Sequence, residues 1–329
     1  MESTSIPLPT LALGTVRLEG RSHAVALRDG TLLVLDSVAD RLDLPTPISV
    51  RDILNEWDRL LPLLRVVSRE STGTRVSVDE VDVLAPVEPI QILQAGANYR
   101  THVIDLAVKH ADLSDGRTEE QVRAETAEMM DLRAAEGDPY FFVGLPSAVT
   151  GPYDTVSLPP GTTKNDWELE LAAVIGRRAH RVSVDDALDV VAGYTIVNDL
   201  TTRELVFRRD MPEIGTDWLR AKNAPGFLPV GPWIVPREEA GDVSELRLTL
   251  ELNGTVMQDE STKDMLFGVA ELISAVSQTV TLLPGDLVLT GSPAGNGMHW
   301  GRLLADGDVM ESTITGLGHQ KTPVIGADA

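Results

Sequence analysis

The sequence predicts an α+β protein that is mainly β, with a mixed and largely antiparallel arrangement of strands. Twenty-seven glycines and twenty prolines, with only 4% aromatic residues, indicate many turns and short strands. Strand-like runs follow one another without the regular helix alternation that a doubly wound parallel sheet requires. The 329 residues suffice for one large or two medium domains, and Pro86 and Pro89 indicate a boundary. We therefore expect a small domain over 1–85 and a larger one over 86–329.

The smaller, N-terminal domain is predicted to be of the α/β type. Its stretch HAVALRDGTLLVLD places two short apolar runs on either side of Asp29-Gly30, a typical β-hairpin signal. Residues 49–69 carry apolar side chains at helical spacing, and Ser49 is suited to cap that helix.

The larger domain combines two helical segments with many short strands. Residues 114–137 are charged and helix-prone, and Gly137 ends them, whereas residues 265–282 form an apolar helix. Apolar runs between turns predict the strands 141–144, 155–158, 168–175, 193–197, 231–235, 246–252 and 286–290.

Charge and composition narrow the class of protein. The formal net charge of −22 makes nucleic acid a poor partner, because basic patches supply most of the affinity for it. No apolar run approaches the roughly 20 residues of a membrane-spanning helix, and the N-terminus lacks the features of a secretory signal. The sequence has no cysteine, which excludes disulfides and fits a cytoplasmic protein. An anionic substrate would need a locally basic site in such a chain.

The strongest chemical signal is a set of three acidic residues. Glu168 and Glu170 alternate with leucines in DWELELAAVIG, so both side chains face one side of the predicted strand. An isolated pair is usually a solvated strand face, but this one runs into an apolar segment, where like charges need a cation between them. Asp199 follows the next apolar strand and supplies a third carboxylate. Such hard oxygen ligands favour Mg²⁺, Mn²⁺ or Ca²⁺.

Three further segments contain reactive side chains. His102 and Asp105 share one face of a helical turn, so Asp105 is able to orient the imidazole as a base, although H-x-x-D alone is more typical of a surface pair. Lys222 precedes a rigid loop rich in proline and glycine, where a lysine is usually solvated. A glycine-rich loop exposes Thr290, but it matches neither a nucleophile elbow nor a dinucleotide-binding loop.

Taken together, these segments resemble the fumarylacetoacetate hydrolase family. The matching stretches occur in the family's order over about residues 90–325: GANYRTH, DWELELAAVIG, GYTIVNDLTTRE, KNAPGFLPVGPWIV, STKDMLFGVAELISAVSQTVTLLPGDLVLTGSPAG and DGDVMESTITGLG. The resemblance implies a mixed β-sandwich roll, a divalent metal (Mg²⁺ or Mn²⁺), a homodimer and a small anionic oxo-acid substrate. Family members cleave C–C bonds of acylpyruvates and related β-diketo acids, and others decarboxylate or isomerise 2-oxo acids.

The resemblance also implies roles for individual residues. It implies that a metal is held by Glu168, Glu170 and Asp199. It implies that catalysis uses His102 as general base, oriented by Asp105, and Lys222 as the cation facing the substrate. It implies that substrate is contacted by Thr290, Arg203, Tyr99 and Arg100.

This sequence departs from the family pattern in two places. Many members have His-x-x-Glu, whereas Asp105 is one methylene shorter. The segment 111–139 after the base is also long and charged. It is either a lid over the site or an exposed excursion, and we favour the lid because it directly follows His102.

Three functions follow as hypotheses. The first is a metal-dependent hydrolase in which His102 activates a water that attacks a β-diketo acid, while the metal and Lys222 stabilise the departing enolate. The second is a decarboxylase or isomerase of a 2-oxo acid, which uses the same enolate without a hydrolytic water. The third is a non-catalytic binding protein on the same scaffold, against which the three carboxylates argue.

Overall fold

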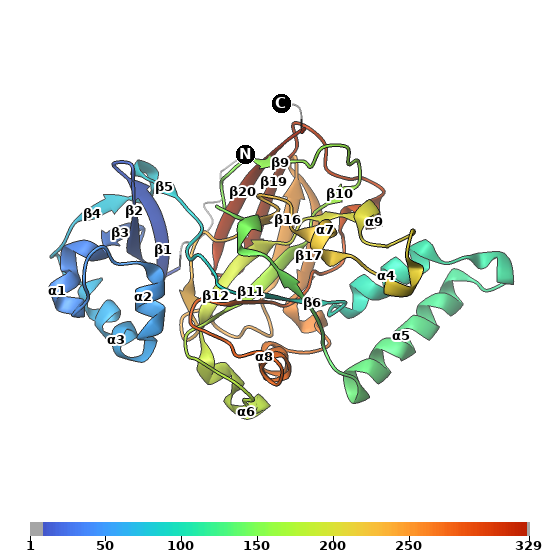
Figure 1. Cartoon of the computed structure of the whole chain (residues 1–329), viewed down its shortest axis with the longest axis horizontal. Helices are drawn as coiled ribbons and strands as arrows, with labels where there is room; N and C mark the ends of the chain where they lie inside the picture. The colour runs from blue at the N-terminus through green and yellow to red at the C-terminus, as the bar shows by residue number, and fades with distance from the viewer. Residues whose placement is uncertain (1–8, 328–329) are drawn as a thin grey trace.

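The structure is a computed structural model that describes residues 9–327. A small N-terminal domain lies beside a larger domain, and a helical hairpin projects from the opposite side of the larger one (Figure 1). The expected α+β architecture, mainly β, is confirmed. Among the described residues, no helix has both the length and the apolar character needed to cross a membrane.

The small domain is one twisted sheet with helices packed against it. Its strands and helices are β1 (Leu11–Leu18), β2 (Arg21–Arg28), β3 (Thr31–Val34), β4 (Arg75–Ser77), β5 (Asp82–Val83), α1 (Ala39–Leu42), α2 (Val50–Asn55) and α3 (Trp57–Val67). The sheet has the order β4-β3-β2-β1-β5. The predicted hairpin is confirmed, since β2 and β3 pair around Asp29 and Gly30, whose φ angles are 48° and 79°. The predicted cap is also confirmed, because the Ser49 side chain accepts from the amide of Asp52 at the start of α2.

The larger domain contains the remaining elements. Its strands are β6 (Ile92–Gly96), β7 (Tyr140–Gly144), β8 (Val149–Thr150), β9 (Val156–Ser157), β10 (Asn165–Asp166), β11 (Leu169–Ile175), β12 (Val191–Asn198), β13 (Thr201–Thr202), β14 (Leu228–Pro229), β15 (Val235–Pro236), β16 (Arg247–Leu252), β17 (Thr255–Ser261), β18 (Leu287–Leu289), β19 (Val309–Ile314) and β20 (Gly318–Ile325). Its helices are α4 (Arg100–His110), α5 (Glu119–Glu136), α6 (Val184–Ala187), α7 (Trp218–Lys222), α8 (Val269–Ser277) and α9 (Gly297–Trp300).

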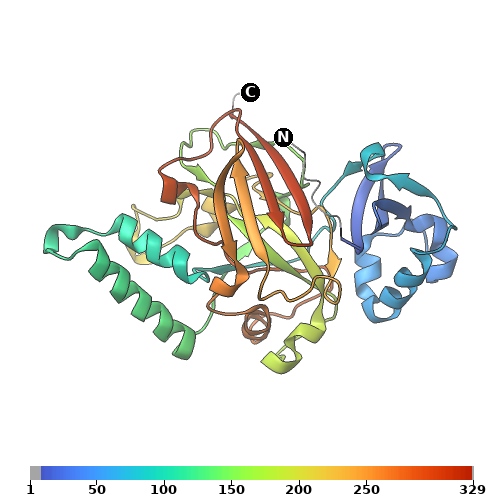
Figure 2. The same cartoon turned by 180° about the vertical axis from the view of Figure 1, so that it is seen from behind.

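Two sheets pack face to face and enclose the core of the larger domain. One has the order β15-β12-β11-β18-β6-β7 and the other β17-β16-β19-β20-β9. Contacts of β11 with β16, and of β12 with β19 and β20, join the two layers, and Figure 2 shows the second sheet from its outer side. Every residue of β11 is buried, because its apolar side chains pack on both faces. The carboxylates near its start are therefore drawn into the protein.

Some predicted elements differ from the structure. The apolar helix expected over 265–282 is shorter, because α8 spans only Val269–Ser277. The strand expected over 231–235 is wrong for most of its length, because β15 begins only at Val235 and Pro232 has no N–H to donate to a ladder. The charged helix expected from residue 114 begins instead at Glu119, after the cap Thr118, and ends before Gly137 as predicted.

The small domain docks on the larger one through a pair of backbone hydrogen bonds. The amide of Leu13 donates to the carbonyl of Ile234 at 2.9 Å, and the amide of Ile234 donates back at 2.8 Å. Gly14 lies against the ring of Trp233, where a side chain would clash. The edge of the larger domain is thus covered by β1 at this point.

Candidate metal centre

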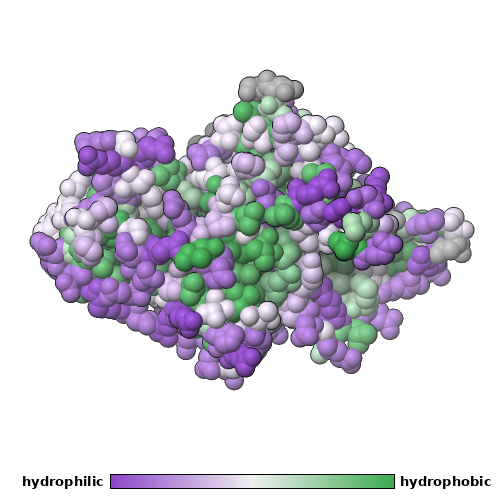
Figure 3. All heavy atoms as spheres, in the orientation of Figure 1, coloured by the Kyte–Doolittle hydropathy of each residue, from purple (hydrophilic) through white to green (hydrophobic). Residues whose placement is uncertain are grey.

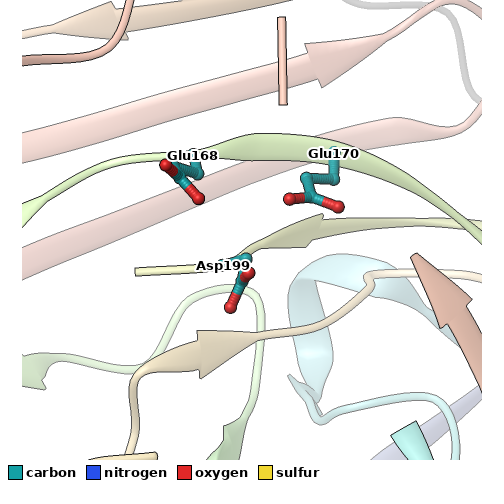
Figure 4. Close-up of side chains that lie close together, drawn as sticks. All are labelled: Glu168, Glu170 and Asp199. Carbon is teal, nitrogen blue, oxygen red and sulfur yellow. The ribbon is translucent and has the colours of Figure 1, made fainter. Parts of the chain in front are cut away.

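Antiparallel pairing of β11 with β12 brings the three acidic residues together. Leu169 pairs with Asn198, so Glu168 and Glu170 lie opposite the residues that end β12 and lead into Asp199. The amide of Asp199 donates to the carbonyl of Glu168 at 2.8 Å, which fixes this register. One carboxylate oxygen from each residue lies within 4.8 Å of the others, and Figure 4 shows the three side chains converging on one space.

Two cations contact this carboxylate cluster. Lys222, at the end of α7, lies with its Nζ against Glu168 Oε2 and 2.6 Å from Asp199 Oδ2. Arg203 places Nη2 at 2.5 Å from Glu168 Oε1. Lys222 is only 3% exposed, so the usual expectation of a solvated lysine does not apply here. The sequence-predicted Lys222 and Arg203 thus meet the predicted metal ligands.

The cations act unequally on the carboxyl groups. Burial alone would raise the pKa of Glu168, but Arg203 and Lys222 outweigh it and lower that pKa to about 2. Burial raises the pKa of Asp199 to about 6 despite Lys222. Burial and the charge of Asp199 raise the pKa of Glu170 well above its usual value. Lys222 and Arg203 therefore do not supply enough positive charge around Glu170 and Asp199 to keep the pKa values of these two groups at their usual level.

The arrangement fits a hard divalent ion. Asp166 also contacts Arg203, so three carboxyl groups share two cations and Glu170 has no cationic partner among the described residues. With all four carboxyl groups ionised, two negative charges would exceed the two cations. A divalent ion bound by Glu168, Glu170 and Asp199 would balance those two charges. The donors are all oxygens, which is the ligand type of Mg²⁺, Mn²⁺ and Ca²⁺.

His102 lies on α4 and is buried near the cluster. Burial lowers its pKa to about 4, although the charge of Glu168 acts in the opposite direction. The imidazole is consequently neutral at physiological pH, as a general base must be. Asp105 instead contacts Arg123 at 3.0 Å and lies 3.7 Å from His299 Nδ1. Within the described residues, the structure gives no hydrogen bond between Asp105 and His102.

The predicted substrate-binding residues are divided between the core and the surface. Tyr99 and Thr290 are fully buried, and the Thr290 hydroxyl donates to the Leu171 carbonyl at 3.0 Å. Arg100 is exposed and forms a two-point ion pair with Asp131 of α5, at 2.7 and 2.9 Å. Arg100 therefore joins the two helices of the hairpin.

Asp166 is a site residue that the sequence reasoning missed. Its carboxylate accepts from Arg203 Nε at 2.8 Å and from the amides of Gly297 and Met298 at the start of α9. It holds Arg203 toward Glu168, and it also fixes the start of α9 through the amides of Gly297 and Met298. The period-two pattern that identified Glu168 and Glu170 includes Asp166 as its preceding member, so that signal was available.

Three residues that sequence reasoning did not select orient the candidate metal ligands. Gln94, in the middle of β6, donates from its amide to Asp199 Oδ1 at 2.6 Å. The amide of Gly291 donates to Glu170 Oε2 at 2.8 Å. Asn98 holds the loop carrying Gly291 in place by donating to the Thr290 carbonyl at 2.8 Å. A buried glutamine inside an apolar strand was a usable signal for Gln94.

Comparison with known proteins places this geometry in a class of enzymes. The family model described as fumarylacetoacetate (FAA) hydrolase C-terminal matches residues 91–325. The chain belongs to the fumarylacetoacetate hydrolase family.

Curated relatives and solved structures have similar folds or sequences. A 2,4-didehydro-3-deoxy-L-rhamnonate hydrolase of Sphingomonas sp. is 45% identical over 57% of this chain and 65% of its own length. A mitochondrial oxaloacetate tautomerase of Bos taurus is 35% identical over 77% of this chain and 73% of its own. The fumarylacetoacetate hydrolase of Exiguobacterium antarcticum is 28% identical with a TM-score of 0.73, covering 96% of this chain and 99% of its own. These relatives include both hydrolases and tautomerases.

Proposed function

We propose that this protein is a Mg²⁺- or Mn²⁺-dependent hydrolase that cleaves a C–C bond in a β-diketo acid, of the acylpyruvate or 2,4-diketo acid class. The observation that carries the proposal is a buried, neutral imidazole, His102, beside a cluster of three carboxyl groups close enough together to hold one metal ion. The Sphingomonas relative, named as a hydrolase of 2,4-didehydro-3-deoxy-L-rhamnonate, supports this substrate class.

The residues divide the chemistry between them. His102 accepts a proton from a water whose oxygen attacks the distal carbonyl carbon. The bond between that carbon and its neighbour breaks, and the electron pair passes to the 2-oxo-acid fragment as an enolate, which a proton then quenches. Lys222 and Arg203 supply positive charge near this fragment. A divalent ion held by Glu168, Glu170 and Asp199 would supply Lewis-acid polarisation of the substrate's oxygens.

A second candidate function is keto–enol tautomerisation or decarboxylation of a 2-oxo acid such as oxaloacetate. The oxaloacetate tautomerase of Bos taurus favours it. A buried neutral imidazole suits tautomerisation equally well, because that reaction needs a base to move a proton between carbon and oxygen but needs no water.

The test is His102→Ala assayed on two reactions with Mg²⁺ present: hydrolysis of an acylpyruvate panel and conversion of oxaloacetate. Loss of a general base lowers kcat by about 10²–10⁴. We expect that loss in hydrolysis, with metal binding unchanged. If the wild-type enzyme converts oxaloacetate but hydrolyses no acylpyruvate, the second function is favoured. No turnover of either substrate by the metal-loaded wild-type enzyme would favour a binding protein.

The expected homodimer is proposed on the basis of exposed apolar side chains. Phe207, Met211, Ile214 and Leu219 are 48–68% exposed between Arg203 and Lys222. Figure 3 shows hydrophobic residues gathered near the middle of the molecule and hydrophilic residues over both ends. Sedimentation of the wild type and of Phe207→Ser tests whether this segment joins two copies, and a monomeric wild type would contradict it.

A further inference from the structure

A cleft of about 930 Å³ lies between the two domains, away from the metal centre. On one side are β1, β2 and the start of α2, and on the other are the linker 84–89 and residues 146–154. Its volume falls within the range of small-molecule sites, which often lie at domain interfaces. Four prolines line it, and they give it walls with little conformational freedom.

Two arginines of this cleft lack acidic partners. Arg17 and Arg51 line it, and neither is within ion-pair distance of a carboxylate anywhere in residues 9–327. Arg51 Nη1 is buried without a hydrogen-bond acceptor. The carboxylate of Asp286 lies in the field of Arg51 but already accepts hydrogen bonds from Gln91 and Leu283. In a chain of net charge −22, two unpaired guanidinium groups on one cleft are unexpected.

The acidic side chains of the cleft, Asp154 and Glu88, keep their charge, but within residues 9–327 neither is in ion-pair contact with Arg17 or Arg51. Asp154 accepts from the Thr150 hydroxyl and the Gly151 amide, which satisfies one of its oxygens. His23 Nδ1 lies 3.0 Å from Asp36 Oδ2, so this ring nitrogen already has an acidic partner. Glu88 is exposed and is the remaining acidic side chain of the lining. The balance leaves the arginines available to a ligand.

We propose that this interdomain cleft binds a small polyanion, a molecule with two or more phosphate or carboxylate charges. Guanidinium groups suit such ligands because their planar donors match both kinds of oxygen pair. The ligand would bridge β1 and α2 of the small domain to the linker and residues 146–154 of the larger one. The proposal does not depend on the activity of the metal centre.

The experiment is calorimetric titration of the metal-free full chain with pyrophosphate and, separately, with citrate, at an ionic strength matched with NaCl. Removing the metal prevents anions from binding at the catalytic centre. We expect one site for at least one probe, and the better probe identifies the phosphate or carboxylate class. Arg17→Gln and Arg51→Gln should each weaken binding roughly tenfold. Arg17 is exposed, so its variant folds even if Arg51→Gln does not.

Two further variants separate a specific site from general attraction. Glu88→Gln removes the opposing charge and should tighten binding a few-fold. Arg21→Gln removes an exposed arginine of β2 that does not line the cleft, and it should leave the affinity unchanged. Failure of both probes to bind in the millimolar range overturns the proposal. Equal weakening by Arg17→Gln and Arg21→Gln overturns it as well.

Discussion

The strands that carry the carboxylates and the helical hairpin that carries His102, the proposed base, differ in construction. Every residue of β11 and β12 is buried, and an antiparallel ladder that runs unbroken from Leu169 to Val174 fixes their register near the carboxylates. The hairpin of α4 and α5 projects into solvent (Figure 2). Its helices are joined by the ion pairs of Arg100 with Asp131 and of Asp105 with Arg123. Exposed ion pairs of this kind contribute little, about 0–1 kcal/mol each.

Because of this difference, the carboxylates and His102 are held in position by different parts of the structure. The carboxylates and their cations are held by core packing, so the candidate metal centre is assembled independently of the hairpin. His102 is buried against that centre, but it belongs to a helix whose outer partner, α5, buries only Val122, Thr126 and Met130. The position of the base is thus the more adjustable part. The lid role of residues 111–139 stays a prediction that this contrast favours.

The largest effect is expected from a change in the rigid region. Glu170→Gln removes a metal ligand, and it should abolish both Mn²⁺ binding and turnover while the protein remains folded. Glu213→Gln, at an exposed position between Arg203 and Lys222, is the matched control and should behave as wild type. Calorimetry with Mn²⁺ and an activity assay measure both. Full activity of Glu170→Gln, or of the wild type in chelator, would exclude a metal centre here.

Lys222→Met should destabilise the metal-free protein by about 3–5 kcal/mol, because it leaves buried Glu168 and Asp199 without their shared cation. Bound metal should offset part of this loss, which urea unfolding with and without Mg²⁺ measures. If the ammonium stabilises the enolate, kcat falls; if it only holds a carboxylate, KM rises. Wild-type stability and kinetics together would mean that the lysine is dispensable.

Metal affinity should depend on pH through the two undercompensated ligands. The pKa of Asp199 is raised to about 6, and that of Glu170 is raised well above its usual value. A metal ion must displace any proton they hold, so affinity falls as pH drops through 6, by about tenfold per unit for each protonated ligand. Titration with Mn²⁺ between pH 5 and 8 checks this. Because the pKa of His102 is about 4, the imidazole stays neutral throughout. Constant affinity over this range would contradict the charge balance described above.

The smallest effect is expected in the hairpin. Asp105→Ala removes a partly exposed contact with Arg123, so kcat/KM should fall by at most about fivefold. It should also increase proteolysis between α4 and α5. Arg123→Ala is the matched partner variant and should give the same result. A loss as large as that of His102→Ala, with no change in proteolysis, would instead show that Asp105 orients the base.

The sequence was most informative where function depends on neighbours along the chain. The alternation of Glu168 and Glu170 is a local property of one strand, and Asp199 was recognised by its place after the next apolar run. Their distance from one another depends on register, which a single sequence does not specify. The same holds for the contact of Lys222 with Glu168, because the family resemblance implies only that Lys222 faces the substrate.

Errors and omissions arose where distant contacts override local pattern. Asp105 has the helical spacing of a partner for His102, yet it contacts Arg123 on the next helix and lies near His299 on α9, far along the chain. Residues 231–235 are apolar like a strand, but Pro232 interrupts pairing and Ile234 bonds to the small domain instead. Neither outcome is visible from residues adjacent in sequence.

The bonds between Leu13 and Ile234 have a practical consequence for anyone shortening this protein. Removing the small domain would leave Ile234 and Trp233, now 0% and 1% exposed, beside open backbone donors and acceptors. An uncovered apolar edge of this kind is a template for intermolecular pairing. We therefore expect the N-terminal domain to keep this edge from pairing with other molecules, and a fragment that begins at the family match near residue 91 to precipitate even though it retains Glu168, Glu170 and Asp199.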